Sequence, residues 1–338
     1  MRAIYSLLTA LLLCMPVWAP QAAAASPDDG GWRSVSSTLV TVRYRGQSDA
    51  FANQVLERTG VFLSDTSRFL GLPWMNQYLV VIARSKEEFV ELQPGTRPAP
   101  EWAGALTYPA LKMVLIMTPG SMRTGGNRYW SLLQHETAHL LLGDAQAKHG
   151  VRLPRWFEEG IATYVSGEMN LSRLLQLGWA QATGATPDFR DLEFSFPSQS
   201  SQAGAAYARS YLFIKYLTRR FGEGAVARLL MESFQRGGIS RGAAAAFGIS
   251  LGDLLDGFDQ YARVKATWIP VVTSTATIWA LITLLFFITW FRKKVQGLRT
   301  VRQWEKEEEI ERLAASLHSF ENERSREDRS REKKPTLH

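Results

Sequence analysis

The sequence feature that most constrains this chain is the pentapeptide His135-Glu136-Thr137-Ala138-His139. Residues four apart on an α-helix project from the same face, so His135 and His139 can hold one metal ion from the same side. Glu136 lies one position further round the helix, where its carboxylate can reach a metal-bound water without being a ligand. The pentapeptide therefore predicts a helix that carries metal-dependent hydrolytic chemistry.

An acidic third ligand from a second helix would complete an open catalytic metal site. Nineteen residues separate His139 from Glu159, which lies in the segment PRWFEEG, and Glu158 beside it is a rival ligand. Gly143 fits a stop for the metal-binding helix, and Pro154 fits the first turn of the next helix. We therefore predict that the second helix folds back and presents a carboxylate to the metal.

Apolar residues flank the pentapeptide on both sides, and they are Leu132, Leu133, Leu140, Leu141 and Leu142. Such flanks are typical of a buried helix. The alternative is a solvated helix that carries two histidines and a glutamate by chance. The chain has only 5 histidines in 338 residues, which makes a chance match at this spacing rare and favours the metal site.

The segments HETAH and PRWFEEGIATY together resemble the gluzincin metallopeptidases, in particular the small peptidase MA-like domains. Their pattern is HExxH followed by Pro, Trp and then Glu-Gly-hydrophobic-Ala. The resemblance spans roughly residues 35 to 265 in the order of elements. It implies one Zn²⁺ ion held by His135, His139 and Glu159, because the family places the ligand directly before the glycine. It also implies that Glu136 is the catalytic general base.

Two further expectations concern residues around the metal. Many members of the family carry an acidic residue four or seven positions after the ligand glutamate, but those positions here are Thr163 and Ser166. The group that orients a metal-bound histidine must therefore come from elsewhere. The resemblance also places a tyrosine of a later helix at the metal, and we predict Tyr207 as the oxyanion donor. Tyr211, one turn away, and His149 are the alternatives, and either tyrosine could instead be an ordinary core aromatic.

The order of periodic segments predicts an α+β fold, with a small mixed sheet followed by a helical zinc-peptidase half of the gluzincin, thermolysin-like type. Expected strands are 38–44, 78–83, 102–108 and 112–118. Expected helices are 48–69, 86–92, one from 127, then 155–166, 169–178, 203–221, 223–235 and 251–266. The Ser- and Gly-rich run 197–205 is expected to be a loop that could cover the cleft. By the resemblance, residues 103–106 correspond to the edge strand that aligns a peptide substrate.

Two apolar segments predict the topology. Residues 1–25 combine one positive charge, a short apolar run and small residues before the expected cleavage site, which is typical of a secretory signal peptide, with an uncleaved anchor as the alternative. Residues 268–291 contain no charged side chain and are long enough to span a bilayer, with a buried soluble helix as the alternative. Basic residues at 292–294 follow at once and predict that the C-terminal side is cytoplasmic.

We therefore expect a metallopeptidase-like domain at 35–266, a transmembrane helix at 268–291 and a charged cytoplasmic tail at 292–338. The expected location is the inner membrane of a bacterial cell, as a single-pass protein whose domain faces the exported, periplasmic side. The only cysteine, Cys14, lies in the signal segment, so the mature chain would contain no disulfide.

The composition limits the classes of partner that this chain is expected to bind. The net charge is +7, but the expected exported part has no Gly-rich phosphate loop and no basic stretch with interleaved aromatics, so no nucleic acid partner is expected. In the tail, apolar residues recur at three- and four-residue spacing, namely Ile310, Leu313, Leu317 and Phe320. This spacing could serve a partner helix, or the tail could be a solvated amphipathic helix.

These observations predict a membrane-anchored zinc-dependent peptidase that hydrolyses peptide bonds of extracytoplasmic proteins or peptides, with Glu136 as general base. The alternative is a catalytically silent peptidase-like module that binds or assembles partners in the cell envelope. Such a module would usually have lost a ligand or the base, and none of the four residues is missing here.

Overall fold

A computed structural model describes most of the region between residues 31 and 294. The described residues are 31–74, 76–95, 103–122, 126–197, 199–273, 277–294 and 312. The predicted signal peptide at 1–25 lies outside them, and so does the predicted tail from 295 onward apart from Arg312. Residues Met1–Pro270 form one compact unit and Val271–His338 form a second.

A five-stranded mixed sheet forms the first half of the fold, in the order β1-β2-β3-β5-β4. Strands β2, β3 and β5 are parallel to one another. Strands β1 and β4 occupy the two edges of the sheet, and each is antiparallel to the strand beside it. The bounds are β1 (Arg33–Ser36), β2 (Val40–Tyr44), β3 (Tyr78–Ala83), β4 (Ala105–Tyr108) and β5 (Met113–Met117). The predicted small mixed sheet is confirmed, but β1 was missed because its four residues are mostly polar.

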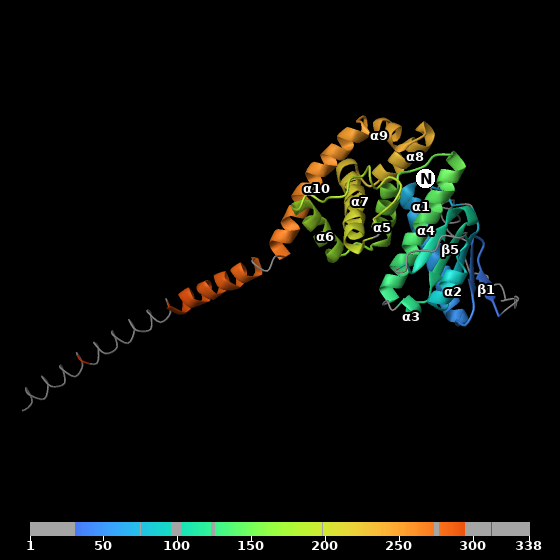
Figure 1. Ribbon diagram of the computed structural model, residues 1–338, viewed down its shortest axis with the longest axis horizontal. Coiled ribbons are helices and arrows are strands. Elements are labelled where there is room, and N and C mark those ends of the chain that lie inside the picture. Colours follow the sequence, from blue (N-terminus) through green and yellow to red (C-terminus); the bar gives the residue numbers. More distant parts are fainter. Residues whose placement is uncertain are drawn as a thin grey trace, which may run out of the picture. The chain divides into compact units, whose positions relative to one another are not determined.

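Helices cover both faces of the sheet (Figure 1). On one face lie α1 (Asp49–Leu70) and the long α4 (Gly126–His149), and on the other lies the short α2 (Lys86–Glu91). The alternation along β2 buries Val40, Val42 and Tyr44 against the first pair of helices. The short elements η1 (Pro109–Leu111) and α3 (Pro119–Met122) flank β5.

In its described residues, the second half contains helices joined by turns and loops, and no strand. It contains α5 (Arg155–Ser166), α6 (Leu171–Ala182), α7 (Ser200–Phe221), α8 (Ala225–Arg236), α9 (Ile239–Phe247) and α10 (Leu251–Thr273). The strands-then-helices order of an α+β fold is therefore confirmed, although α9 was missed. The expectation of a loop over 197–205 was wrong, because α7 begins at Ser200. Its Gly204 lies so close to Gln176 of α6 that an added Cβ would be 1.6 Å from the Gln176 side-chain oxygen, so the small residue serves helix packing.

Helix α4 does not stop at Gly143, as the sequence suggested, but continues to His149. A Cβ at position 143 would lie 2.3 Å from the Cβ of Pro109, so the glycine is required for close packing rather than for helix termination. Gly150, with φ of +63°, follows the last helical residue. The connection to α5 is therefore only five residues long, from 150 to 154.

Both sides of α4 are buried, as its leucine-rich flanks predict. Leu133, Leu140 and Leu141 pack in the core beneath the sheet, whereas Leu142 and Ala145 belong to the core of the helical half. Each fully buried leucine contributes roughly 1.5–3 kcal/mol relative to an exposed one. Helix α4 is thus the element shared by the two halves, and its position is fixed from both sides.

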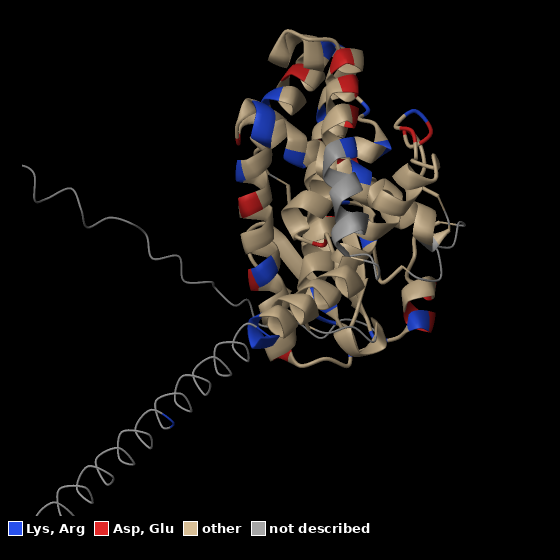
Figure 2. Cartoon of the chain, turned by 90° about the vertical axis from the view of Figure 1, so that its left-hand side faces the viewer, with Lys and Arg blue, Asp and Glu red and all other residues tan. Residues whose placement is uncertain are grey.

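Within the described residues, no helix combines the length and the apolar character that crossing a membrane requires. The structure describes the predicted segment 268–291 only in part, since residues 274–276 lie outside the described residues. Residues 277–294 are helical and end in three basic residues. Positions of acidic and basic residues alternate along the described helices in Figure 2.

Close packing of α5 on α7 generates a first prediction. A Cβ on Gly160 would lie 2.6 Å from the Ser210 carbonyl oxygen, and a backbone atom cannot move away cheaply. Gly160→Ala should therefore lower the free energy of unfolding by about 1–3 kcal/mol, measured by urea denaturation with a chelator present.

The matched control is Gly60→Ala in α1, where nothing lies within 4 Å of the added Cβ. That change should raise stability by about 0.5–1 kcal/mol, because alanine loses less backbone entropy in a helix. Equal stability of the two variants would contradict the packing account.

Candidate metal centre

Three ligand atoms converge between α4 and α5. The Nε2 atoms of His135 and His139 lie 3.2 Å apart. The Oε2 atom of Glu159 lies 3.2 Å from the first and 3.5 Å from the second. All three residues are buried, with at most 8% of each residue exposed. The structure thus brings together the three predicted metal ligands, and they are the one group of this kind found within the described residues.

The geometry of this group fits a zinc ion. A point equidistant from three atoms at these separations lies about 1.9 Å from each, and Zn–N and Zn–O distances in proteins are about 2.0–2.2 Å. The Oε2 atom of Glu159 is buried and has no hydrogen-bond partner among the described residues, which is costly unless a cation lies beside it. Two imidazoles and one carboxylate are also the donor set of open zinc sites.

The second oxygen of Glu159 is held by Arg155, whose Nη2 lies 2.6 Å from Oε1. This contact leaves Oε2 as the single oxygen directed at the two histidines. Glu158, the rival ligand, is engaged elsewhere: its carboxylate accepts a hydrogen bond of 2.6 Å from Gln146 and lies 3.5 Å from Arg155. The choice of Glu159 over Glu158 therefore agrees with the structure.

The partner of His135, which the sequence did not identify, is Glu168. Its Oε2 lies 3.3 Å from Nδ1 of His135, on the side opposite the metal-facing nitrogen. The chain reaches this point because α5 ends in Gly167, a C-cap in the left-handed conformation with φ of +66°. The left-handed residue turns the chain back at position 168, which stands nine residues after Glu159 rather than four or seven.

The charges of the site residues shift one another's pKa values. Burial opposes the positive charge of His135, but the carboxylates of Glu159 and Glu168 outweigh it and raise the pKa of His135 to about 10. Burial likewise opposes the negative charge of Glu159, but His139, His135 and Arg155 hold its pKa well below the usual range. Without metal, the site therefore holds a proton on His135 at neutral pH.

Glu136 follows His135 on α4, and its carboxylate contacts the sheet edge at β4. Its Oε2 accepts a hydrogen bond of 2.5 Å from the hydroxyl of Thr107 on β4. It is buried, with 8% of the residue exposed, and it is not part of the ligand group. A carboxylate beside a metal site, outside the ligand set, is placed to accept a proton.

Of the two tyrosines of α7 considered as donors, Tyr207 lies near the charged groups of the site. Burial, followed by the charge of Glu159, raises the pKa of the Tyr207 hydroxyl. Its ring packs on Phe196 and lies under the guanidinium of Arg173. Tyr211 instead packs on Tyr164, with ring centroids 5.8 Å apart. The role of Tyr207 as donor stays a prediction.

His149 lies at the far end of α4, exposed and stacked on Phe234 of α8, and it is not part of the metal group.

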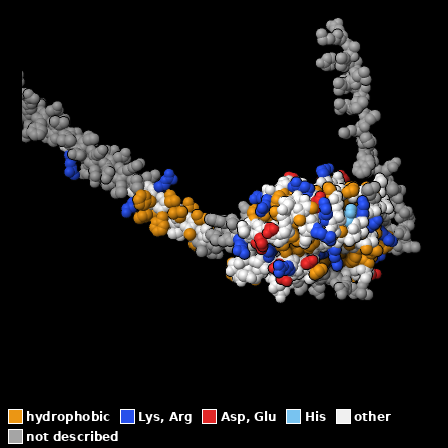
Figure 3. All heavy atoms as spheres, turned by 90° about the horizontal axis from the view of Figure 1, so that it is seen from above, with side chains coloured by type: hydrophobic (Ala, Val, Ile, Leu, Met, Phe, Trp, Pro, Cys, Tyr) orange, Lys and Arg blue, Asp and Glu red, His pale blue; other side chains and the backbone are white. Residues whose placement is uncertain are grey.

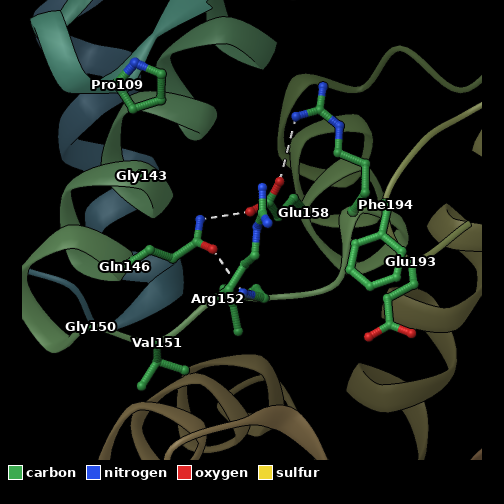
Figure 4. A pocket seen from close by; sticks show the side chains of 11 residues that line it. Pro109, Gly143, Gln146, Gly150, Val151, Arg152, Glu158, Glu193 and Phe194 are labelled. Atoms are coloured by element: carbon green, nitrogen blue, oxygen red, sulfur yellow. Dashed lines mark hydrogen bonds and ion pairs between the residues drawn. The ribbon is translucent and has the colours of Figure 1, made fainter.

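Beside the centre, a cavity of about 510 Å³ opens at the turn between α4 and α5 (Figure 4). Gln146 lies in the wall of this cavity. Its amide nitrogen donates a hydrogen bond to Glu158, and its side-chain carbonyl oxygen accepts one from the backbone N–H of Leu153. This pair of bonds fixes the short turn that returns the chain to the metal.

Three site residues were missed from the sequence: Thr107, Arg155 and Glu168. Arg155 stands four positions before Glu159 on one helix, and this spacing could have revealed the pair. Thr107 and Glu168 carry no comparable signal, because their contacts depend on the sheet edge and on a left-handed turn.

Comparison with known proteins gives one family match. The model of the Peptidase MA superfamily matches residues 86–264, which is more than half of the chain and includes both metal-binding segments. No curated protein sequence matches the chain.

Among solved structures, the M1 zinc metallopeptidase from Deinococcus radiodurans is 18% identical over 75% of this chain and 51% of its own, with a TM-score of 0.34. The native yeast LTA4 hydrolase is 12% identical over 72% of this chain and 38% of its own, with a TM-score of 0.37. The chain spans about half the length of the first of these proteins.

The proton on His135 generates a second prediction. Zinc must displace this proton, so the affinity for Zn²⁺ should rise with pH, by about tenfold per pH unit above neutrality, and level off as the pH passes about 10. Competition with a chelator of known protonation measures this dependence on the full-length protein. A constant affinity between pH 7 and 9 would show that His135 is already neutral in the metal-free site.

Proposed function

This chain belongs to the Peptidase MA superfamily, and on that premise we propose that it is a zinc-dependent peptidase with Glu136 as general base. The observation that carries the proposal is the convergence of His135, His139 and Glu159 on one point, beside a carboxylate outside the ligand set. Three protein ligands leave a fourth position for water or substrate, which is the arrangement of a catalytic zinc site.

Zinc at this site would polarise the scissile carbonyl and lower the pKa of its bound water to about 7. Glu136 would accept a proton from the attacking water and deliver it to the leaving nitrogen. Glu168 holds the ring of His135 in orientation through Nδ1, and Arg155 keeps one oxygen of Glu159 directed at the metal. The hydroxyl of Tyr207 donates a hydrogen bond to the oxyanion that forms on the carbonyl.

The substrate we propose is a peptide in extended conformation. Strand β4 is an edge strand, so one side of its backbone is not paired with another strand of the sheet. The same strand carries Thr107, which contacts Glu136, so a peptide added beside β4 would pass the metal centre.

The roles of the ligands and the base can be separated by substitution. His135→Ala or His139→Ala should abolish stoichiometric zinc binding by the full-length protein. Glu136→Gln should retain zinc and lose hydrolysis of a mixed peptide library, because the amide cannot accept the proton. Loss of zinc in Glu136→Gln, or full activity, would contradict the assignment, and a wild type that binds zinc but cleaves no peptide would favour the silent binding module instead.

The oxyanion donor can be tested with a matched pair. Tyr207→Phe should lower kcat by about a hundredfold to a thousandfold, the scale for loss of one oxyanion donor. KM and zinc content should hardly change, because the ring still packs on Phe196. Tyr211→Phe, one turn away and packed on Tyr164, is the control and should be close to neutral. A larger loss in the control would place the donor one turn further along α7.

We also propose that the protein is a single-pass protein of a bacterial inner membrane, with the peptidase domain on the exported, periplasmic side and extracytoplasmic substrates. The support is the uncharged run 268–291 and the exposure of its described part. From Ile278 to Phe291, the large apolar side chains are 47–64% exposed on the helix 277–294, where Figure 3 shows a hydrophobic surface. A contiguous apolar surface of this kind is expected to be covered, and lipid suits an uncharged helix.

The orientation follows from Arg292, Lys293 and Lys294, since basic residues remain on the cytoplasmic side. A reporter that is active only outside the cytoplasm should work when fused near Gly257 and fail when fused after Lys294. The reverse pattern would place the metal centre in the cytoplasm and contradict the proposed substrate pool.

A further inference from the structure

Thr107 lies on the face of the edge strand that α4 covers. Along β4, Ala105 belongs to the core shared with α4, whereas Leu106 and Tyr108 pack into the cluster on the opposite face of the sheet. Because side chains alternate along a strand, Thr107 shares the face of Ala105. Its hydroxyl is therefore directed at the helix that carries the metal ligands and the base.

This hydroxyl has two acceptors, both on Glu136. The carboxylate Oε2 is 2.5 Å from Thr107 Oγ1, and the backbone carbonyl oxygen of Glu136 is 2.9 Å from it. A hydroxyl carries one proton, and hydrogen bonds to an ionised acceptor are shorter and roughly twice as strong as neutral ones. The carboxylate is therefore the preferred acceptor, and Thr107 fixes one of its two oxygens.

No other side chain in the described part of the chain makes a hydrogen bond to the Glu136 carboxylate. A glutamate side chain has three rotatable bonds and loses conformational entropy when it is ordered. The contact with Thr107 holds Oε2 at the strand, and the other oxygen of the carboxylate is then presented in one orientation. A base that is already oriented reacts faster, because misplacement by about 1 Å can cost about a hundredfold in rate.

The geometry points to Thr107 as a positioning residue that orients the general base Glu136 from the edge strand. This inference rests on the proposed peptidase function. Thr107 itself touches neither metal nor substrate; it acts through Glu136. It also joins the strand proposed to align the substrate to the residue proposed to activate the water, so substrate and base are placed by the same element.

A purely structural contact between β4 and α4 would have a different signature. Thr107→Val keeps the shape of the side chain and removes the hydroxyl, whereas Thr107→Ser keeps the hydroxyl and removes the methyl group. If only packing mattered, the serine variant would be the more damaging of the two. If the hydroxyl orients Glu136, the valine variant loses turnover and the serine variant regains it.

The experiment compares full-length, zinc-loaded wild type with the two variants, by kcat, KM, zinc content and thermal midpoint on one cleaved peptide. Thr107→Val should lower kcat by about tenfold to a hundredfold, with KM and zinc content close to the wild type. Thr107→Ser should retain most of the turnover. The matched control is Thr41→Val in β2, a strand threonine whose hydroxyl bonds Ser36 at 3.0 Å, far in sequence from the metal ligands, and it should leave kcat unchanged.

Thr107→Val with the kcat of the wild type would overturn the inference, and so would a serine variant as slow as the valine variant. A loss of kcat in Thr107→Val that merely follows a loss of zinc would also overturn it, because the effect would then lie in the metal site. A wild type that cleaves no peptide overturns the proposed function and this inference together, whereas an active wild type with a neutral Thr107→Val overturns the inference alone.

Discussion

The site depends on the close crossing of α4 and α5, which buries two imidazoles and a carboxylate within 3.5 Å of one another. A buried carboxylate is costly unless it is paired, and here Arg155 and the two histidines share the charge of Glu159. Two glycines allow close packing on the outer side of each helix: Gly143 lets α4 approach Pro109, and Gly160 lets α5 lie on the backbone of α7. These contacts hold each of the two helices against its other neighbour, and the charges stabilise the ligand group between them.

The two halves of the fold contribute different parts of the chemistry. The sheet half supplies the edge strand β4 and the hydroxyl that bonds Glu136. The helical half supplies Glu159, the proposed metal ligand, Glu168, which lies beside Nδ1 of His135, and Tyr207, the proposed oxyanion donor. Helix α4 packs into both cores, so the histidines and the base lie at the junction where the two halves meet.

The group of three possible ligands could be predicted from the sequence because its geometry is local or carried by a specific motif. His135 and His139 are one helical turn apart, and Glu159 precedes a glycine that packing requires. The bounds of β3 and α5 were likewise predictable, since their apolar patterns are uninterrupted. Glu168 and Thr107 could not be predicted, because one reaches the site through a left-handed turn and the other through strand pairing distant in sequence. The predicted end of α4 at Gly143 was wrong, because in the sequence a glycine needed for close packing cannot be distinguished from one that ends a helix.

In the proposed metal centre, one zinc ion is held by two imidazole nitrogens and a single carboxylate oxygen. Anomalous X-ray scattering at the zinc edge, from crystals of the zinc-loaded protein, measures this directly. We predict one strong peak at about 2.0–2.2 Å from Nε2 of His135, Nε2 of His139 and Oε2 of Glu159, with Glu158 still bonded to Gln146. The absence of a peak at this point, or a peak whose carboxylate ligand is Glu158, would contradict the account.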